Sequence, residues 1–307
     1  MKALVVDTSA PERIALREVG PPQPARDEAL VEVRAISLNR GELNRIAAAA
    51  DGWRPGWDIG GVVTEPAASG GPPAGARVIG VLGLAAWAET VAVPVTQLAV
   101  LPDQVSFAQA AALPVAGLTA LRVLRQGRPL LGSRVLMTGA SGGVGRFAVQ
   151  LAHRGGAHVT GIVGSETRAA GLRELGADEV VVGHQSVGGK YDLVLESAGG
   201  ESLAHLLRCI DPDGTLVMFG NSSQQPTTFD VREVYLGGHI RLQGFMLFHE
   251  FPGDPPARDL GCLASLVAGG ALDPQVAGEM PWEDMPKALA QLRARAVPGK
   301  LVLTLGG

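Results

Sequence analysis

The stretch that decides the fold is "VLMTGASGGVGRFAVQLA" at residues 135–152. An apolar run, "VLMTG", leads into a glycine-rich turn and then into an apolar helical pattern, "GRFAVQLA". Turns of this kind commonly bind phosphate groups, because the backbone N–H groups at the start of the helix are free to donate hydrogen bonds. The stretch therefore indicates a nucleotide site.

Length and composition restrict the class of protein. The chain has 307 residues, more than one hydrophobic core usually supports, so we expect two domains. Hydrophobic residues make up 46% of the chain and charged residues 18%, below the usual quarter, which indicates a folded globular protein. The net charge is −4 and no basic run occurs. These values argue against a nucleic-acid surface and favour a small-molecule partner.

The compartment follows from the N-terminus and the cysteines. "MKALVVD" lacks the charged and apolar regions of a signal peptide. Cys209 and Cys262 stand alone, so neither a disulfide framework nor a metal site is indicated. The longest uncharged stretch, residues 104–121, contains Pro114 and fits two soluble helices better than a membrane span. We expect a cytoplasmic protein with no membrane association.

The order of elements predicts the domain organisation. Short β-rich runs such as "ALVEVRAISL" dominate the first hundred residues and predict a barrel-like domain. Apolar strands then alternate with amphipathic helices, including one expected over "ETRAAGLRELG" (166–176), which predicts a parallel sheet. We expect an α/β protein with domains at 1–115 and 116–254. The remaining segment, 255–307, ends in the strand-like run "GKLVLTL" and is expected to return to the first domain.

The glycine-rich turn resembles a dinucleotide fingerprint in its context. The G-x-G-x-x-G pattern falls on Ala140, Gly142 and Gly145, after a strand and at the start of a helix. Small residues there let the backbone approach a pyrophosphate and let the helix pack closely. The alternative is a turn that only packs tightly. The candidate cofactor residues of the turn are Ala140, Ser141, Gly142, Gly143, Val144 and Gly145.

The end of the second strand of this region favours NADPH over NADH. In NAD-binding chains a carboxylate there holds the ribose 2′-hydroxyl group. Here Gly164 stands at that place, followed by Ser165 and Arg168, which are suited to binding a 2′-phosphate. The alternative is that both side chains face solvent, with Glu166 as an ion-pair partner.

Several segments together carry a resemblance to a known family. They are "GLTALRVL" (117–124), "LRELGADEVV" (172–181), "YDLVLESAGG" (191–200), "SLNRGELNRI" (37–46), "RPGWDIGGVV" (54–63) and "AAWAETVAVP" (85–94). With the opening stretch, they resemble the medium-chain dehydrogenase/reductase superfamily, in its zinc-free quinone oxidoreductase branch related to zeta-crystallin. Enoyl reductase domains of fatty-acid and polyketide synthases share these segments. The resemblance implies a GroES-like β-barrel catalytic domain, a doubly wound Rossmann domain and a homodimer joined near "HIRLQGF" (239–245).

The departures from the superfamily predict the reaction. Where its zinc alcohol dehydrogenases carry a catalytic ligand, this chain has Ser37 to Asn39, and no cysteine precedes Cys209. Without a Lewis acid, hydride acceptors must delocalise the developing charge themselves, as quinones and α,β-unsaturated carbonyls do. We expect an NADPH-dependent reductase of such acceptors. The alternatives are an enoyl-thioester reductase and an NADPH-binding protein with a structural or regulatory role.

The resemblance also implies roles for single residues. Asn39 matches the active-site asparagine of the branch, which donates a hydrogen bond to the substrate or cofactor; the alternative is a capping or turn residue. Trp87 is expected in the substrate pocket or in the core, and Asp58 near the site or organising the barrel. The remaining candidates for the cofactor are His184, Gly220, Asn221, Phe245 and Lys300, and Phe245 is also a candidate for the substrate pocket. His184 has a surface position as its alternative.

Overall fold

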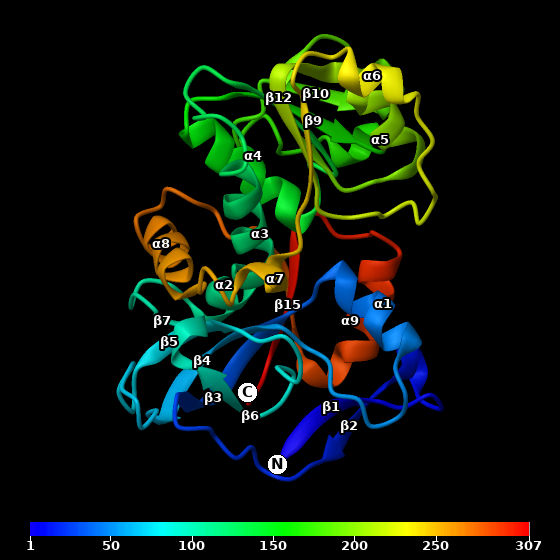
Figure 1. Cartoon of the computed structure of the whole chain (residues 1–307). Helices are drawn as coiled ribbons and strands as arrows, with labels where there is room; N and C mark the ends of the chain where they lie inside the picture. Colours follow the sequence, from blue (N-terminus) through cyan, green and yellow to red (C-terminus); the bar gives the residue numbers. More distant parts are fainter. Residues whose placement is uncertain (307) are drawn as a thin grey trace. The chain divides into compact units, whose positions relative to one another are not determined.

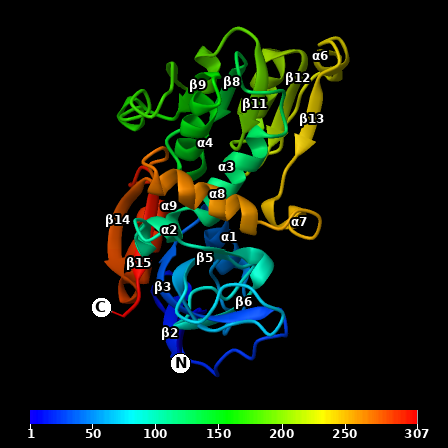
Figure 2. The ribbon, with the colours of Figure 1, turned by 90° about the vertical axis from the view of Figure 1, so that its left-hand side faces the viewer.

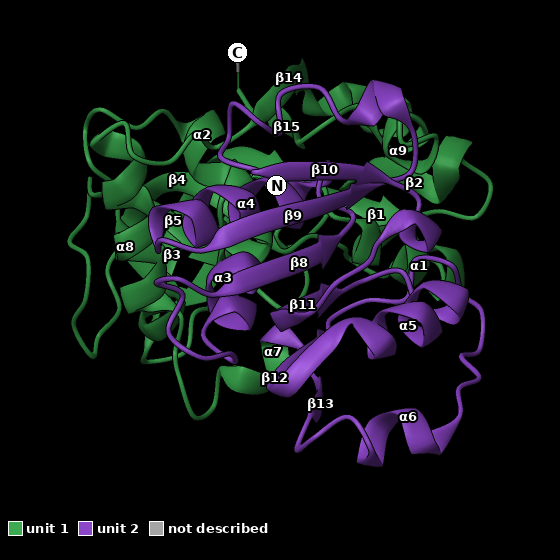
Figure 3. Ribbon diagram, turned by 90° about the horizontal axis from the view of Figure 1, so that it is seen from above, with its two compact units in different colours: residues 1–118, 248–307 green, residues 119–247 purple. Residues whose placement is uncertain are grey.

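The computed structural model describes residues 1–306 and divides the chain into two compact units (Figure 3). Unit 1 comprises residues 1–118 and 248–307, and unit 2 comprises residues 119–247. The expected boundaries were 115/116 and 254/255. The first boundary lies at 118/119 instead, within helix α3 (Pro114–Leu124), whose first turn packs with unit 1. The second moves because Phe248 packs edge-on against Trp57 of unit 1, with ring centroids 5.3 Å apart.

Unit 1 is built around a seven-stranded sheet (Figure 1). Its order is β14-β15-β3-β4-β5-β7, and β6 pairs with β3 off this path. The strands are β3 (Glu28–Ser37), β4 (Asp58–Glu65), β5 (Arg77–Val81), β6 (Thr90–Pro94), β7 (Leu98–Val100), β14 (Val276–Pro281) and β15 (Lys300–Thr304). A separate pair joins β1 (Lys2–Val6) to β2 (Ile14–Glu18). The C-terminal strand β15 lies antiparallel to β3, so the chain returns to unit 1 at its end.

The helices of unit 1 cover this sheet (Figures 1 and 2). They are α1 (Arg40–Ala48), α2 (Phe107–Ala112), α7 (Leu247–Glu250), α8 (Ala257–Ala268) and α9 (Met285–Arg293). Ser106 begins α2 with a capping box, in which its hydroxyl accepts from Gln109 N–H at 3.1 Å and the Gln109 side chain accepts from Ser106 N–H at 2.9 Å. The uncharged stretch 104–121 thus forms α2 and the start of α3, as expected. No helix of residues 1–306 is long and apolar enough to span a membrane.

Unit 2 contains a six-stranded, entirely parallel sheet in the order β10-β9-β8-β11-β12-β13 (Figure 3). The strands are β8 (Arg134–Thr138), β9 (His158–Val163), β10 (Glu179–Val182), β11 (Tyr191–Glu196), β12 (Ile210–Met218) and β13 (Arg241–Gly244). This is the doubly wound Rossmann order, and it confirms the expected fold class. Strand order reverses between β8 and β11, where such sheets bind their ligands.

The helices of unit 2 differ from expectation at one place. They are α4 (Gly143–Arg154), α5 (Gly200–Leu206) and α6 (Val231–Tyr235). The helix predicted over 166–176 is wrong, because the structure has only a 3-10 turn at Glu166–Arg168 followed by further turns. Gly171 and Gly176 adopt φ values of +77° and +105°, which an α-helix does not accommodate. The apolar pattern reflects the burial of Leu172 instead.

Candidate functional site

The turn after β8 has the shape expected of a dinucleotide-binding turn. Gly142 is the N-cap residue of α4, and Arg146 N–H makes the first helical hydrogen bond to its carbonyl, at 2.9 Å. The N–H groups between them therefore have no partner within the helix and can donate to an anion. Gly145 is required at its place, since an added Cβ would lie 2.3 Å from the Gly139 carbonyl oxygen.

The loop after β11 meets this turn at the switch point of the sheet. Ser197 N–H donates to the Thr138 hydroxyl at 2.8 Å. The fully buried Glu196 carboxylate fixes the loop by accepting the N–H groups of Ala198 and Gly199, both at 2.9 Å, and the Ser202 hydroxyl at 3.0 Å. Sequence reasoning did not single out Glu196. Its fully buried place at the end of a strand only becomes evident once the loop is folded.

The loops after β12 and β13 complete the same edge. Gly199 has φ +73°, and a Cβ there would lie 2.2 Å from Asn221 Oδ1, so Asn221 packs directly on the Gly199 backbone. Gly220 is similarly close to Ser197, whose carbonyl oxygen would lie 3.1 Å from an added Cβ. Phe245 follows β13, is 7% exposed and donates its N–H to Met218 at 2.8 Å. The structure thus brings Gly220, Asn221 and Phe245 to the edge where the glycine-rich turn lies.

The end of β9 carries the residues expected to distinguish NADPH from NADH. Gly164 follows the strand directly and is exposed, and Ser165 is half-buried. The guanidinium of Arg168 lies beside this position, since a Cβ added to Gly164 would be 3.9 Å from Arg168 Nη1. The Ser165 hydroxyl is 3.0 Å from that of Thr167. A cation and two hydroxyl groups therefore face the end of the strand.

Arg146 links the two parts of this nucleotide site. It is 7% exposed, and its Nη2 donates to the Ala170 carbonyl at 2.8 Å while its Nε donates to the Ser141 carbonyl at 3.4 Å. The arginine therefore ties the glycine-rich turn to the segment that carries Arg168. Sequence reasoning missed it, because both bonds go to carbonyl groups that no motif reveals.

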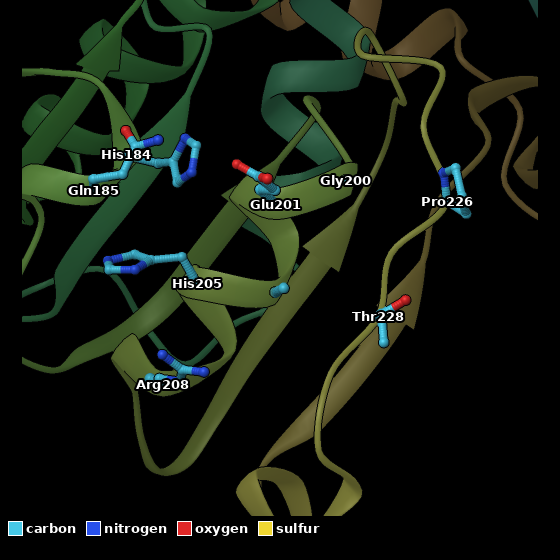
Figure 4. Close-up of a pocket in the computed structure, with 9 residues that line it drawn as sticks. His184, Gln185, Gly200, Glu201, His205, Arg208, Pro226 and Thr228 are labelled. Atoms are coloured by element: carbon cyan, nitrogen blue, oxygen red, sulfur yellow. The ribbon is translucent and has the colours of Figure 1, made fainter.

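His184 lines a pocket of about 370 Å³ in unit 2 (Figure 4). It follows β10, whose last residue Val182 pairs with Val163 of β9, so His184 and Gly164 lie at the ends of neighbouring strands. The ring of His184 packs edge-on against that of His205, with centroids 5.8 Å apart. Figure 4 shows both rings and Arg208 on one side and the loop of Pro226 and Thr228 on the other. His184 therefore faces a pocket, and its role in binding the cofactor stays a prediction.

Unit 1 holds a buried network centred on Asp58. This side chain is fully buried. Its Oδ2 accepts from Ser37 Oγ at 2.6 Å, Asn39 Nδ2 at 2.7 Å and Lys300 Nζ at 3.3 Å. Its Oδ1 accepts from Val115 N–H at 2.9 Å. The carboxylate thus joins strands β3, β4 and β15 to the start of α3.

Lys300 fixes the orientation of Asn39. Its ammonium group, 2% exposed, also donates to the Leu38 carbonyl at 2.8 Å and to Asn39 Oδ1 at 2.7 Å. With the bond to Asp58, all three ammonium protons have partners. The amide oxygen of Asn39 therefore faces the Lys300 ammonium, and its amide nitrogen faces the Asp58 carboxylate. These two contacts fix the orientation of the amide. One N–H of the half-buried amide is not used in this network.

Glu42 lies in the first turn of α1, and its side chain contacts the backbone of Asn39, the N-cap residue of that helix. It is fully buried, and its Oε2 accepts Asn39 N–H at 2.7 Å while its Oε1 has no hydrogen-bond partner. Burial, reinforced by the negative charge of Asp58, raises the pKa of the Glu42 carboxyl well above its ordinary value of 4.5. The native protein therefore holds a proton on Glu42 that the unfolded chain releases.

The proton on Glu42 predicts a pH dependence of stability. Above pH 4.5 the unfolded chain binds fewer protons than the native protein, so the free energy of unfolding falls as pH rises toward the native pKa. Glu42→Gln keeps the shape of the protonated acid and should remove this dependence. We expect its melting temperature to exceed that of the wild type by an increasing margin as the pH rises above 4.5. Glu65→Gln, at an exposed position, is the control; parallel curves for all three proteins would contradict the account.

Two of the buried tryptophans of unit 1 are Trp87 and Trp57, and Trp87 was a candidate for the substrate pocket. Trp87 has no exposed surface and belongs to the core of unit 1, so the structure supports the core alternative rather than a place in the substrate pocket. Trp57, next to Asp58, was not singled out by the sequence. Its ring packs beside Gly41 of α1, where a Cβ would lie 2.5 Å from it, and Arg45 covers the ring at 5.2 Å.

Within residues 1–306, no group of three or more histidine, cysteine or acidic side chains is arranged to hold a metal ion. The buried polar side chains that unit 1 brings together are Ser37, Asn39, Asp58 and Lys300. Unit 2 presents a dinucleotide-type site at the carboxyl edge of a Rossmann sheet. Together the fold and these residues define a nucleotide-dependent oxidoreductase of the two-domain type.

Comparison with known proteins agrees with this class. A family model described as zinc-binding dehydrogenase matches residues 143–260. A chloroplast envelope quinone oxidoreductase homologue from Arabidopsis thaliana is 30% identical over 93% of this chain and 92% of its own length. The chain belongs to the medium-chain dehydrogenase/reductase superfamily, in its zinc-free quinone oxidoreductase branch.

Three further comparisons bear on function. The Escherichia coli quinone oxidoreductase complexed with NADPH has a TM-score of 0.86 at 25% identity, covering 99% of this chain and 100% of that one. The acryloyl-coenzyme A reductase of Metallosphaera sedula is 28% identical over 99% of this chain and 100% of its own length. The spectinabilin polyketide synthase system protein NorB of Streptomyces orinoci is 35% identical over 90% of this chain, but the match spans only 13% of that protein.

Proposed function

We propose that the chain is an NADPH-dependent oxidoreductase that transfers hydride to quinones or α,β-unsaturated carbonyl compounds. One observation carries the proposal: the loops after β8, β11 and β12 lie together at the switch point of the unit 2 sheet. Arg168 lies beside the end of the neighbouring strand β9. The NADPH complex of the related quinone oxidoreductase supports the choice of cofactor. When bound, NADPH supplies the hydride, while the protein orients the reactants and stabilises developing charge.

The cofactor residues fall into three groups along the edge of the sheet. The pyrophosphate is held by Ala140, Ser141, Gly142, Gly143, Val144 and Gly145. The adenosine end is held by Gly164, Ser165, Arg168 and His184, and the nicotinamide end by Gly220, Asn221 and Phe245. Lys300 is assigned to Asn39 instead of the cofactor, because each of its ammonium protons already has a buried partner.

Asn39 is the proposed catalytic residue. Hydride transfer to a conjugated acceptor leaves negative charge on the acceptor oxygen, and a fixed N–H donor stabilises that charge. The unused N–H of the Asn39 amide supplies this donor. The Lys300 ammonium at Asn39 Oδ1 draws electron density toward the amide oxygen and so strengthens the N–H as a donor. Ser37 and Asp58 hold the pair in place and do not touch the acceptor.

Arg168→Ala tests the cofactor assignment. The variant should weaken NADPH binding about tenfold to a hundredfold, because a charge-assisted hydrogen bond to the 2′-phosphate is lost, and should leave NADH binding nearly unchanged. Arg173→Ala, which removes another arginine of the same segment, is the control. Titration of each cofactor by fluorescence measures both constants. An equal loss for NADH and NADPH would contradict the 2′-phosphate assignment.

The substrate class is tested by following NADPH loss with matched quinones, enones and enoyl thioesters. We expect turnover of quinones and enones, with enoyl thioesters as the second candidate because of the acryloyl-coenzyme A reductase relative. NADPH binding without turnover of any acceptor would favour the alternative of a structural or regulatory cofactor-binding protein.

We also infer a homodimer in a reducing compartment such as the cytoplasm. Strand β13 lies at the edge of the unit 2 sheet, and near it Tyr235, Leu236 and Met246 are more than half exposed. Such an edge is available for pairing with a second copy. Sedimentation of Leu242→Glu should show a shift toward monomer, whereas Leu131→Glu, at an exposed site elsewhere in unit 2, should not. Both cysteines are free, which supports the compartment.

A further inference from the structure

Unit 1 contains a second cavity, of about 310 Å³, that the proposed reaction does not use. Its walls are mostly apolar and come from Pro22, Leu82, Leu84, Val91 and Ala92, and Arg54 supplies its one charged side chain. We call this the Arg54 cavity.

The guanidinium of Arg54 has no partner of its own. Its Nε is buried without a hydrogen bond, and within residues 1–306 no ion pair or hydrogen bond to its side chain is found. Burial lowers the pKa of Arg54, as expected for a cation that has lost water without gaining an anion. By contrast, the nearby Arg45 donates to the Gly83 carbonyl at 3.2 Å and lies over the ring of Trp57.

The backbone holds Arg54 at the cavity wall. Ala85 N–H donates to the Arg54 carbonyl at 3.0 Å, and Leu82 N–H donates to the Trp57 carbonyl at 2.8 Å. The loop 82–85 is thereby anchored at both of its ends to the segment 54–57. The remaining N–H groups of this half-buried guanidinium have no acceptor within residues 1–306, so an anion in the cavity can accept their hydrogen bonds.

We propose that the Arg54 cavity binds the carboxylate of a small acid with an apolar body. A planar carboxylate matches the paired donors of a guanidinium, whereas a phosphate dianion would need more donors than one arginine surrounded by apolar walls provides. The apolar part of the acid packs against Leu82, Leu84 and Val91. The carboxylate belongs either to the hydride acceptor itself or to a separate carboxylic acid. Both sources offer the same carboxylate on an apolar body.

Calorimetric titration with hexanoate tests the site, with hexanol as the neutral probe of the same chain length. The full chain without NADPH or acceptor is used, so the outcome does not depend on the proposed reductase activity. We expect hexanoate to bind, hexanol to bind more weakly, and Arg54→Met to weaken hexanoate at least about tenfold. Arg34→Gln, which removes a half-buried arginine paired with Glu32 in the same unit, should bind like the wild type.

Two results would overturn the proposal: no hexanoate binding at millimolar concentration, or equal binding to the wild type and to a folded Arg54→Met. Folding is checked by the melting temperature, and Arg54→Lys provides a second variant that keeps the charge but loses the paired donors. Kinetics then separate the sources. Competition between hexanoate and the acceptor assigns the carboxylate to the substrate, and binding without competition assigns it to a separate ligand.

Discussion

Gly145→Ala should abolish NADPH binding while most of the chain stays folded. The new methyl group would lie 2.3 Å from the Gly139 carbonyl oxygen and 2.6 Å from Ala140 Cα. Both of these contacts are to backbone, so the helix and the turn must separate, and the N–H groups that receive the pyrophosphate move with them. We expect affinity to fall by at least about a hundredfold, because several charge-assisted hydrogen bonds are lost together.

Gly188→Ala provides the matched control for this variant. Gly188 also lies in unit 2, and a Cβ there would meet nothing within 4 Å. This variant should bind NADPH like the wild type. Retention of wild-type affinity by Gly145→Ala would contradict the assignment of residues 140–145 to the pyrophosphate.

Lys300→Met should lower both stability and turnover. It leaves the fully buried Asp58 carboxylate without its cation, which is expected to reduce the free energy of unfolding by about 3–5 kcal/mol. It also removes the donor that orients Asn39, so kcat should fall about a hundredfold or more with little change in the Kd for NADPH. Denaturant unfolding and steady-state kinetics measure these two effects.

A second variant separates the two effects of Lys300. In Lys300→Met combined with Asp58→Asn, the buried charge is gone, so most of the lost stability should return. Turnover should stay low, because the Asn39 amide is no longer held between a cation and an anion. A double variant that regains both stability and turnover would show that Lys300 serves the fold alone.

The places of the candidate cofactor residues in the fold could be predicted from the sequence because their signals are local. Turn geometry sets the glycine spacing after β8. The alternation of strands and helices in a parallel sheet sets where the residues after β9 lie, and the structure places both groups at the ends of strands as expected. The prediction of a helix over 166–176 was wrong, and the reason is local as well. Its apolar spacing suits a helix, but Gly171 and Gly176 allow the chain to turn instead.

The catalytic half could be predicted only in part. Asn39 was identified through resemblance, whereas its bond to Lys300 joins residues 261 positions apart, a separation that no spacing rule covers. Lys300 was expected at the cofactor. The sequence around a lysine does not show which buried groups its ammonium will contact in the folded chain. The sequence left Trp87 between the core and the substrate pocket, since burial depends on which strands pack over the ring.

Deuterium transfer tests the central claim most directly. NADPH carrying deuterium at both positions of the nicotinamide C4 is incubated with the protein and an α,β-unsaturated ketone, and the product is examined by NMR. The account predicts a saturated ketone with one deuterium at the β-carbon, formed much more slowly by Asn39→Ala than by the wild type. NADPH that binds but transfers no deuterium to the enone or to any quinone, or an Asn39→Ala protein as fast as the wild type, would contradict it.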